Sequence, residues 1–131
     1  MTTEAVVFDT WAWWAIIFDE PGGRQLRDRH VRPGGIHTSA WALGELSAKL
    51  RPGIPADRWR DIMTTIRLAG PIEPVTEGLA LEGAQLRAGL RKKAPRASLG
   101  DGVMLATARN LGLPLISGDD AFRGQKDVRR S

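Results

Sequence analysis

The order of short apolar runs and longer helical runs is the feature that most limits how this chain can fold. Four apolar runs of strand length occur, at residues 5–10, 36–39, 72–76 and 113–117. The segments between them have helical composition, and several begin at Ser or Thr and end at Gly or Pro. Strands that alternate with helices predict an α/β fold with a short, mostly parallel central sheet flanked by helices.

The length of the chain indicates one domain. Its 131 residues are enough for one hydrophobic core and too few for two domains. Hydrophobic residues make up 42% and charged residues 26%, which is typical of a globular protein. We expect residues 1–131 to form a single domain, with a flexible basic tail over about residues 124–131 because "GQKDVRRS" is polar and terminal.

Composition also excludes several classes of protein. The chain has no cysteine, so disulfides and thiolate metal sites are excluded. The apolar stretch at residues 10–18 is too short to span a bilayer, and acidic Glu4 and Asp9 precede it. We therefore expect a cytoplasmic protein without a membrane partner. The net charge of +4 is compatible with a polyanionic partner.

Four acidic residues occur where such a fold places its functional sites. Asp9 follows the first predicted strand and Asp119 follows the last, so both belong at the carboxyl edge of the sheet. Glu45 lies in the helix after the second strand, and Asp101 lies in the first turn of a later helix. Clustered carboxylates repel unless a cation neutralises them, and oxygen-only ligands favour Mg²⁺ or Mn²⁺. The four acids together predict a metal site.

Each acid also has a simpler structural interpretation. Asp9 can cap the helix that follows it. Glu45 can pair with Lys49 four residues later, and Asp101 completes a capping box with Ser98. Asp119 and the neighbouring Asp120 can be turn residues. The metal hypothesis therefore depends on the combination of acids.

Several motifs carry a family resemblance. They are "VVFDT" near the start, "SAWALGELSAKL", "SLGDGVMLATARNLGLPLIS" and "SGDDAF". In order and spacing, the chain resembles a PIN-domain ribonuclease, specifically the VapC-type toxin of a toxin–antitoxin pair. The resemblance places the family's acids on Asp9, Glu45, Asp101 and Asp119, with Ser117 supporting the site.

The sequence departs from the family pattern at two places. Gly100 and Gly102 replace the usual alanines beside Asp101, and we expect them to loosen the start of that helix. Asp120 adds an acid where the family varies, and we expect it to support the site without binding metal.

The resemblance implies a fold, an activity and partners. The fold would be a PIN-like, three-layer α/β/α domain. The activity would be RNA hydrolysis with Mg²⁺ or Mn²⁺, bound by Asp9, Asp101 and Asp119 and, through water, by Glu45. The partners would be an RNA substrate, a cognate type II antitoxin and a second copy of the chain in a homodimer or a larger assembly. Trp13 and Trp41 are the predicted contacts with an antitoxin segment in a groove between helices.

A basic stretch precedes Asp101, and two other functions remain open. The stretch is a candidate RNA-binding region, although a solvated helix end explains it equally simply. The first alternative function is a PIN-like module that binds RNA or a partner without catalysis. A weaker alternative is a haloacid-dehalogenase-type phosphatase, which needs a second Asp where Trp11 stands. The basic residues are Arg87, Arg91, Lys92, Lys93 and Arg96.

Overall fold

The core of the fold is a sheet of five parallel strands, seen in a computed structural model that describes residues 4–122, 124–125 and 127–129. The strand order is β3-β2-β1-β4-β5, so the first strand is central. The strands are β1 (Val6–Phe8), β2 (Ile36–Ser39), β3 (Ile72–Glu73), β4 (Leu115–Ile116) and β5 (Val128–Arg129). The parallel α/β fold predicted from the sequence is confirmed.

The register of the central strands brings three segments to one edge. Phe8 of β1 lies opposite Thr38 of β2 on one side and Ile116 of β4 on the other. The next residue in each chain segment therefore lies at the same, carboxyl edge of the sheet. These residues are Asp9, Ser39 and Ser117.

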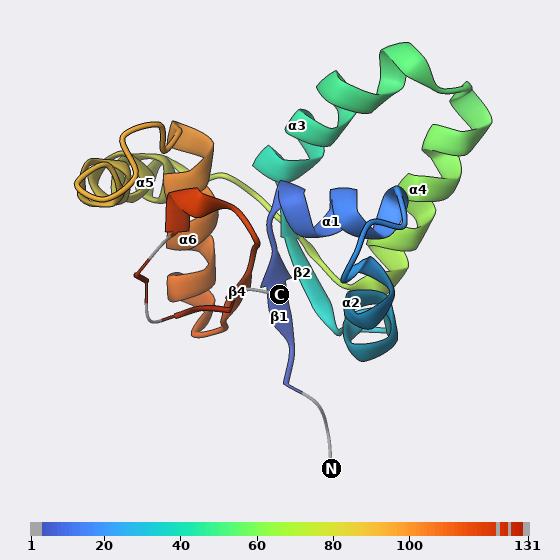
Figure 1. The fold of residues 1–131 in the computed structure, drawn as a ribbon, viewed down its shortest axis with the longest axis horizontal. Coiled ribbons are helices and arrows are strands. Elements are labelled where there is room, and N and C mark those ends of the chain that lie inside the picture. The colour runs from blue at the N-terminus through green and yellow to red at the C-terminus, as the bar shows by residue number, and fades with distance from the viewer. Residues whose placement is uncertain (1–3, 123, 126, 130–131) are drawn as a thin grey trace.

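Helices cover both faces of the sheet, which gives three layers (Figure 1). On one face lie α1 (Thr10–Ile17), α2 (Gly23–His30) and α4 (Ala56–Ala69), and on the other α6 (Leu99–Leu111), backed by α5 (Glu77–Leu90). The helix α3 (Ala40–Leu50) rises from the carboxyl edge between the two groups. None of the described helices is long and apolar enough to cross a membrane.

Alternating side chains of β1 join the two layers of helices. Val6 and Phe8 belong to the cluster formed with α1, α2 and α4, whereas Val7 belongs to the cluster formed with α6. All three side chains are fully buried. A strand that is apolar at every position is expected where both faces of a parallel sheet are covered.

Side-chain caps start four of the helices. Asp9, Ser39, Thr76 and Ser98 each accept a hydrogen bond from a backbone N–H in the first turn of the helix that follows. The caps at Asp9 and Ser98 were predicted from the sequence, the first as an alternative to a metal role. The helix α4 begins after Pro55, without a side-chain cap.

The fifth strand was not predicted. Val128 and Arg129 pair with β4, within the segment where we expected a flexible tail. Val128 is buried, and Arg129 donates to the carboxylate of Glu4 at 2.7 Å. The strand covers the edge of β4 that would otherwise be open. Residues 126, 130 and 131 of the expected tail lie outside the described residues.

The helices α5 and α6 approach each other through glycines. A Cβ added at Gly102 would lie 2.0 Å from the carbonyl oxygen of Gly83 in α5, and one at Gly83 would lie 2.7 Å from Val103. Gly100 is equally restricted, because its Cβ would lie 2.3 Å from the indole nitrogen of Trp41. These glycines allow α3 and α5 to pack closely against α6, a role that was not predicted from the sequence.

Candidate metal and nuclease site

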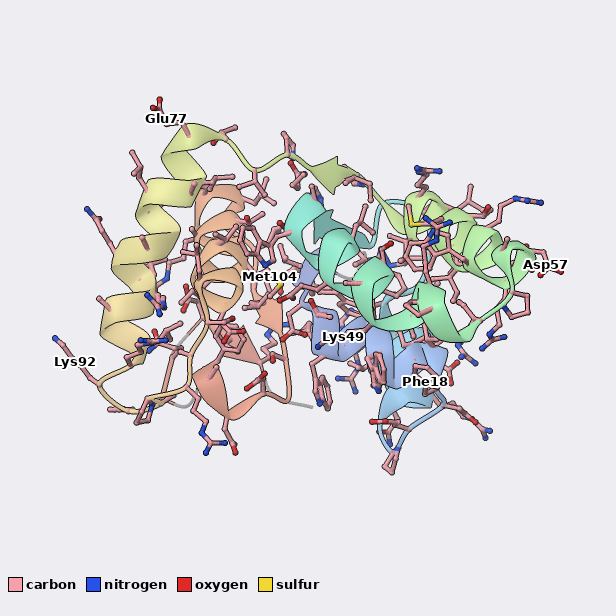
Figure 2. The ribbon with its side chains drawn as sticks, turned by 90° about the horizontal axis from the view of Figure 1, so that it is seen from above. Phe18, Lys49, Asp57, Glu77, Lys92 and Met104 are labelled. Carbon is pink, nitrogen blue, oxygen red and sulfur yellow. The ribbon has the colours of Figure 1, made fainter. Side chains whose placement is uncertain are left out.

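The four predicted acids line one pocket at the carboxyl edge of the sheet. The pocket has a volume of about 510 Å³ and lies between α1, α3 and α6. In Figure 2, which views this edge from above, the labelled Met104 of α6 and Lys49 of α3 mark its position. Its acidic lining residues are Asp9, Glu45, Asp101 and Asp119.

Asp9 is the buried acid of the pocket. Its side chain is only 2% exposed, and its Oδ1 accepts the backbone N–H of Ala12 at 2.8 Å. Burial raises the pKa of Asp9 from 3.8 to about 7, against hydrogen bonds from Ser117 and Ala12 that lower it. The charges of Asp119 and Asp101 raise this pKa further. Asp9 is thus both a helix cap and a buried acid of the pocket.

Ser117 connects two of the acids. It lies immediately after β4, fully buried, and hydrogen-bonds the side chain of Asp9. Its Oγ accepts the backbone N–H of Asp119 at 2.9 Å, and Oδ1 of Asp119 accepts the N–H of Ala121 at 2.9 Å. The supporting role predicted for Ser117 therefore has a geometric basis.

Asp119 and Asp120 face different surroundings. Both are exposed, but only Asp119 lines the pocket of the other three acids. Asp120 begins a short 3-10 helix and lines an adjoining pocket of about 530 Å³, which Asp119 also reaches.

Glu45 contacts α1 across the pocket. The hydroxyl of Thr10 donates to Oε1 of Glu45. Among the described residues no ion pair joins Glu45 to Lys49, which was the simpler alternative. The other carboxylate oxygen of Glu45, Oε2, lies close to α6: a Cβ added at Gly100 would be 3.1 Å from it.

Asp101 caps α6 and also lines the acidic pocket. Its Oδ2 accepts the N–H of Ser98, and its own N–H donates to the Ser98 hydroxyl, which completes the capping box. Burial raises the pKa of Asp101, as do the charges of Asp119 and Glu45, although the Ser98 hydrogen bonds lower it. A helix cap and a place in the acidic pocket are therefore compatible.

The pocket offers the ligand atoms that a divalent cation prefers, but its carboxylates are too far apart to bind one as they stand. Its acids offer oxygen ligands only, as Mg²⁺ and Mn²⁺ prefer. Burial and, to a smaller extent, the neighbouring acids raise the pKa values of Asp9 and Asp101, so a cation at this place would stabilise their ionised forms. Within the described residues, however, no group of three or more Asp, Glu, His or Cys side chains is arranged to hold an ion as it stands. An ion would have to draw these carboxylates together.

The predicted basic stretch separates into different environments. Arg96 lines both pockets, and Lys93 lines the one that Asp120 shares. Arg91 instead donates to the carbonyl of Ala97 at 2.9 Å, which stabilises the loop before α6. Arg87 is half-buried, and Lys92 lies at the outer margin of the molecule (Figure 2). Only Arg96 and Lys93 lie beside the acids.

The sequence analysis missed further residues that line the pocket, among them a cation and two tryptophans. Lys49 supplies a second cation, and Trp11 and Trp14 supply an apolar wall. A Cβ at Gly118 would lie 2.4 Å from the ring of Trp11, so this glycine allows the indole to pack on the loop that carries Asp119. Helical spacing was an available signal, because Trp14 follows Trp11 by three residues on α1 and Lys49 follows Glu45 by four residues on α3.

A second, apolar groove lies on the other side of α1. It has a volume of about 330 Å³ and is formed by α1, α2 and α4. Trp13 lies at its floor, 1% exposed, with its indole N–H donating to the Thr38 hydroxyl at 2.9 Å. The other predicted partner residue, Trp41, is half-buried against Gly100 and does not line this groove. Arg27, Arg58 and Asp61 provide charges to the groove.

Comparisons with known proteins agree with this fold. No curated protein matches the sequence. A toxin–antitoxin complex from Klebsiella pneumoniae has a TM-score of 0.73 at 21% identity, over 95% of this chain and 96% of that one. VapBC2 from Rickettsia felis, bound to a promoter DNA fragment, has 0.73 at 13%, over 97% of each chain. VapC20 from Mycobacterium tuberculosis, a sarcin–ricin loop cleaving toxin, has 0.61 at 24%, over 95% and 99%.

Membership of a family depends on the sequence match. The solved structures are less than 25% identical to this chain, so they establish its fold alone. The family model "PIN domain" matches residues 6–127, nearly the whole chain. This protein therefore belongs to the PIN domain family.

Proposed function

We propose that this protein is a VapC-type toxin that hydrolyses RNA with Mg²⁺ or Mn²⁺ in the acidic pocket and is inhibited by a cognate antitoxin. The observation that carries the proposal is the meeting of four acids from four separate segments in one pocket. Family membership and the resemblance to toxin–antitoxin complexes support the same activity. The family assignment leaves the phosphatase alternative without support.

The four acids would have two different roles in the reaction. Asp9, Asp101 and Asp119 would bind the ion, and Glu45 would hold it through water or orient the attacking water. A bound divalent ion supplies the positive charge that lowers the pKa of water and stabilises a phosphodiester under attack. One oxygen of each carboxylate already accepts a hydrogen bond from the chain, which fixes its orientation.

Cations around the pocket would bind the RNA backbone. Lys49 and Arg96 line the acidic pocket, and Lys93 lies in the adjoining one. A strand of RNA lying across both pockets would bring its phosphates to these side chains on either side of the acids. The proposed roles of the more distant Arg87, Arg91 and Lys92 are weaker, because none of them lines either pocket.

The apolar groove would bind the antitoxin. An amphipathic segment could place apolar side chains over Trp13, Ile16 and Ile17, with its charged residues near Arg58 and Asp61. We also propose that the chain forms a homodimer, alone or within a larger toxin–antitoxin assembly.

Cleavage of RNA by purified, antitoxin-free protein tests the proposal. End-labelled single-stranded and structured RNAs are incubated with Mg²⁺ or Mn²⁺ and, in parallel, with EDTA. We expect discrete products with the metal and none with EDTA. Cleavage that survives EDTA would contradict the mechanism. A protein that binds RNA but never cuts it would favour the non-catalytic module, which the present spacing of the acids also allows.

A further inference from the structure

One wall of the acidic pocket is apolar and has no part in metal or phosphate chemistry. Trp11 and Trp14 line the pocket together with the four acids, and both are only half-buried. Exposed indole surface beside a charged site is costly, because apolar area in contact with water is unfavourable. A pocket that held only an ion and a phosphate would not need this wall.

Both indoles are held in place by other residues. Trp11 packs on the backbone at Gly118, where even a Cβ would lie 2.4 Å from the ring. Trp14 donates its Nε1–H to Oε1 of Glu20 at 3.2 Å, and its ring centroid lies 4.4 Å from that of Phe18. Rings fixed in this way lose little freedom when a flat group stacks on them.

The size and charge of the pocket limit what can occupy it. A volume of about 510 Å³ is large compared with the roughly 30 Å³ that a water molecule takes in the liquid, so an ion and a phosphate group leave most of it vacant. Lys49 and Arg96 line the pocket and attract phosphates, and the proposed divalent ion would offset the repulsion between a phosphate and the acids. The remaining space beside the indoles suits a flat, uncharged group joined to a phosphate.

We propose that Trp14, with Trp11 beside it, is a stacking surface for one nucleobase of the RNA, next to the phosphodiester that lies at the acids. The inference rests on the proposed function, since it deepens how that site binds its substrate. Stacking on an aromatic side chain accepts every base, because every base has a π-face. It would position the adjacent phosphodiester without setting a strict sequence preference.

Removal of the base and removal of the indole test the contact from both sides. The substrate is a short single-stranded RNA that the wild type cuts once, with abasic ribose placed in turn on the 5′ and the 3′ side of the cut. Wild type, Trp14→Leu and Trp14→Phe are compared by kcat/KM on intact and abasic RNA. Trp59→Leu in α4 is the matched control, because Trp59 is equally half-buried and lies outside the pocket.

Loss of the Trp14 indole and loss of the base should lower kcat/KM by the same factor and should not add to each other. We expect Trp14→Leu to lower kcat/KM on intact RNA about tenfold, which lies within the range for a lost stacking contact. One of the two abasic positions should lower wild-type kcat/KM by a similar factor. On that abasic RNA Trp14→Leu should cost nothing further, and Trp14→Phe should retain most activity on intact RNA. Trp59→Leu should lose the same factor on abasic RNA as the wild type.

Other outcomes overturn the inference. If neither abasic position matters, or if the losses from the indole and the base multiply, Trp14 does not stack on that base. If neither change affects cleavage but Trp14→Leu weakens binding of the antitoxin, the wall belongs to the protein partner. If the wild type cuts no RNA with Mg²⁺ or Mn²⁺, the proposed function itself fails, which is a separate result.

Discussion

The acidic pocket and the apolar groove lie on opposite sides of the same helix, and they are built in opposite ways. Thr10, Trp11 and Trp14 of α1 line the pocket, whereas Trp13, Ile16 and Ile17 line the groove. In the pocket every acid accepts a hydrogen bond, and burial raises the pKa of Asp9 and Asp101. In the groove the lining is mainly apolar, with its charged residues from α2 and α4.

If the proposed function holds, this difference separates the catalytic region from the surface that binds the antitoxin. A pocket with fixed, mutually repelling acids stores electrostatic free energy that a cation can relieve. A groove lined by aliphatic and aromatic side chains gains free energy when another chain removes it from water. The helix α1 supplies a wall to both, so a partner bound in the groove would lie on the opposite side of α1 from the acids. Changes on the two faces of α1 should therefore have separable effects.

The largest expected effect is on stability and comes from Asp9. Its pKa is 3.8 when unfolded and about 7 when folded, so the unfolded chain ionises first as the pH rises. The free energy of unfolding is therefore highest below about pH 4 and falls as the pH rises toward 7. Above pH 7 it is lower than its value at pH 4 by about 4 kcal/mol. Asp9→Asn cannot ionise, so in EDTA it should be more stable than wild type at pH 8 and lack this pH dependence.

Urea unfolding at pH 5 and pH 8 measures this effect. Asp61→Asn, an exposed acid at the groove, is the control and should follow the wild-type profile, because its charge is already solvated. If Asp9→Asn and wild type lose stability in parallel between pH 5 and 8, ionisation of Asp9 is not the cause of the loss.

The second effect is on catalysis and separates two adjacent acids. Asp119→Asn removes an acid from the pocket, and we expect RNA cleavage to fall on the order of 100-fold or more. Asp120→Asn changes an acid of the adjoining pocket and should cost about tenfold or less. Single-turnover cleavage of one labelled RNA compares the two. Equal losses would place both acids at the ion, and a larger loss for Asp120 would reverse their roles.

The smallest expected effect is on binding of the antitoxin in the groove, with RNA cleavage unchanged. Ile17→Ser removes apolar surface from the groove, and we expect affinity for the antitoxin to fall about tenfold. RNA cleavage by the antitoxin-free variant should match the wild type. Leu81→Ser, an exposed leucine of α5, is the control. Calorimetric titration that finds equal affinity for Ile17→Ser and wild type would show that the partner binds elsewhere.

Much of the architecture could be predicted because local signals carry it. The apolar runs of β1 and β4 and the caps at Ser39, Thr76 and Ser98 depend on residues close in sequence. The strand β5 could not be recognised in the same way, since two residues in a polar segment give no periodicity. Its partner β4 is the reason that it forms.

The glycines of α6 show a limit of another kind. Helix propensity treats Gly100 and Gly102 as weak positions, which led to the expectation of a loose helix start and gave no sign of their packing role. Their role depends on Trp41 and Gly83, which come from two other helices. Long-range packing of this type has no local signature.

The acids of the site were predictable, but their surroundings were not. The resemblance placed all four, and parallel-sheet topology explains why Asp9 and Asp119 share an edge. The contacts that orient them, such as Thr10 with Glu45 and Ser117 with Asp9, depend on distances between elements. The wall formed by Trp11 and Trp14 was not predicted, because it depends on the packing of α1 beside the loop at Gly118.

Binding of Mn²⁺ without any RNA tests most directly whether the four acids form one metal site. Isothermal titration at pH 7.5 compares wild type, Asp119→Asn and Asp120→Asn, so that a change of binding is not confused with a change of substrate affinity. We predict that the wild type binds Mn²⁺, that Asp120→Asn weakens binding about tenfold or less, and that Asp119→Asn weakens it more. Equal Mn²⁺ binding by wild type and Asp119→Asn, or no binding by the wild type, would contradict the account.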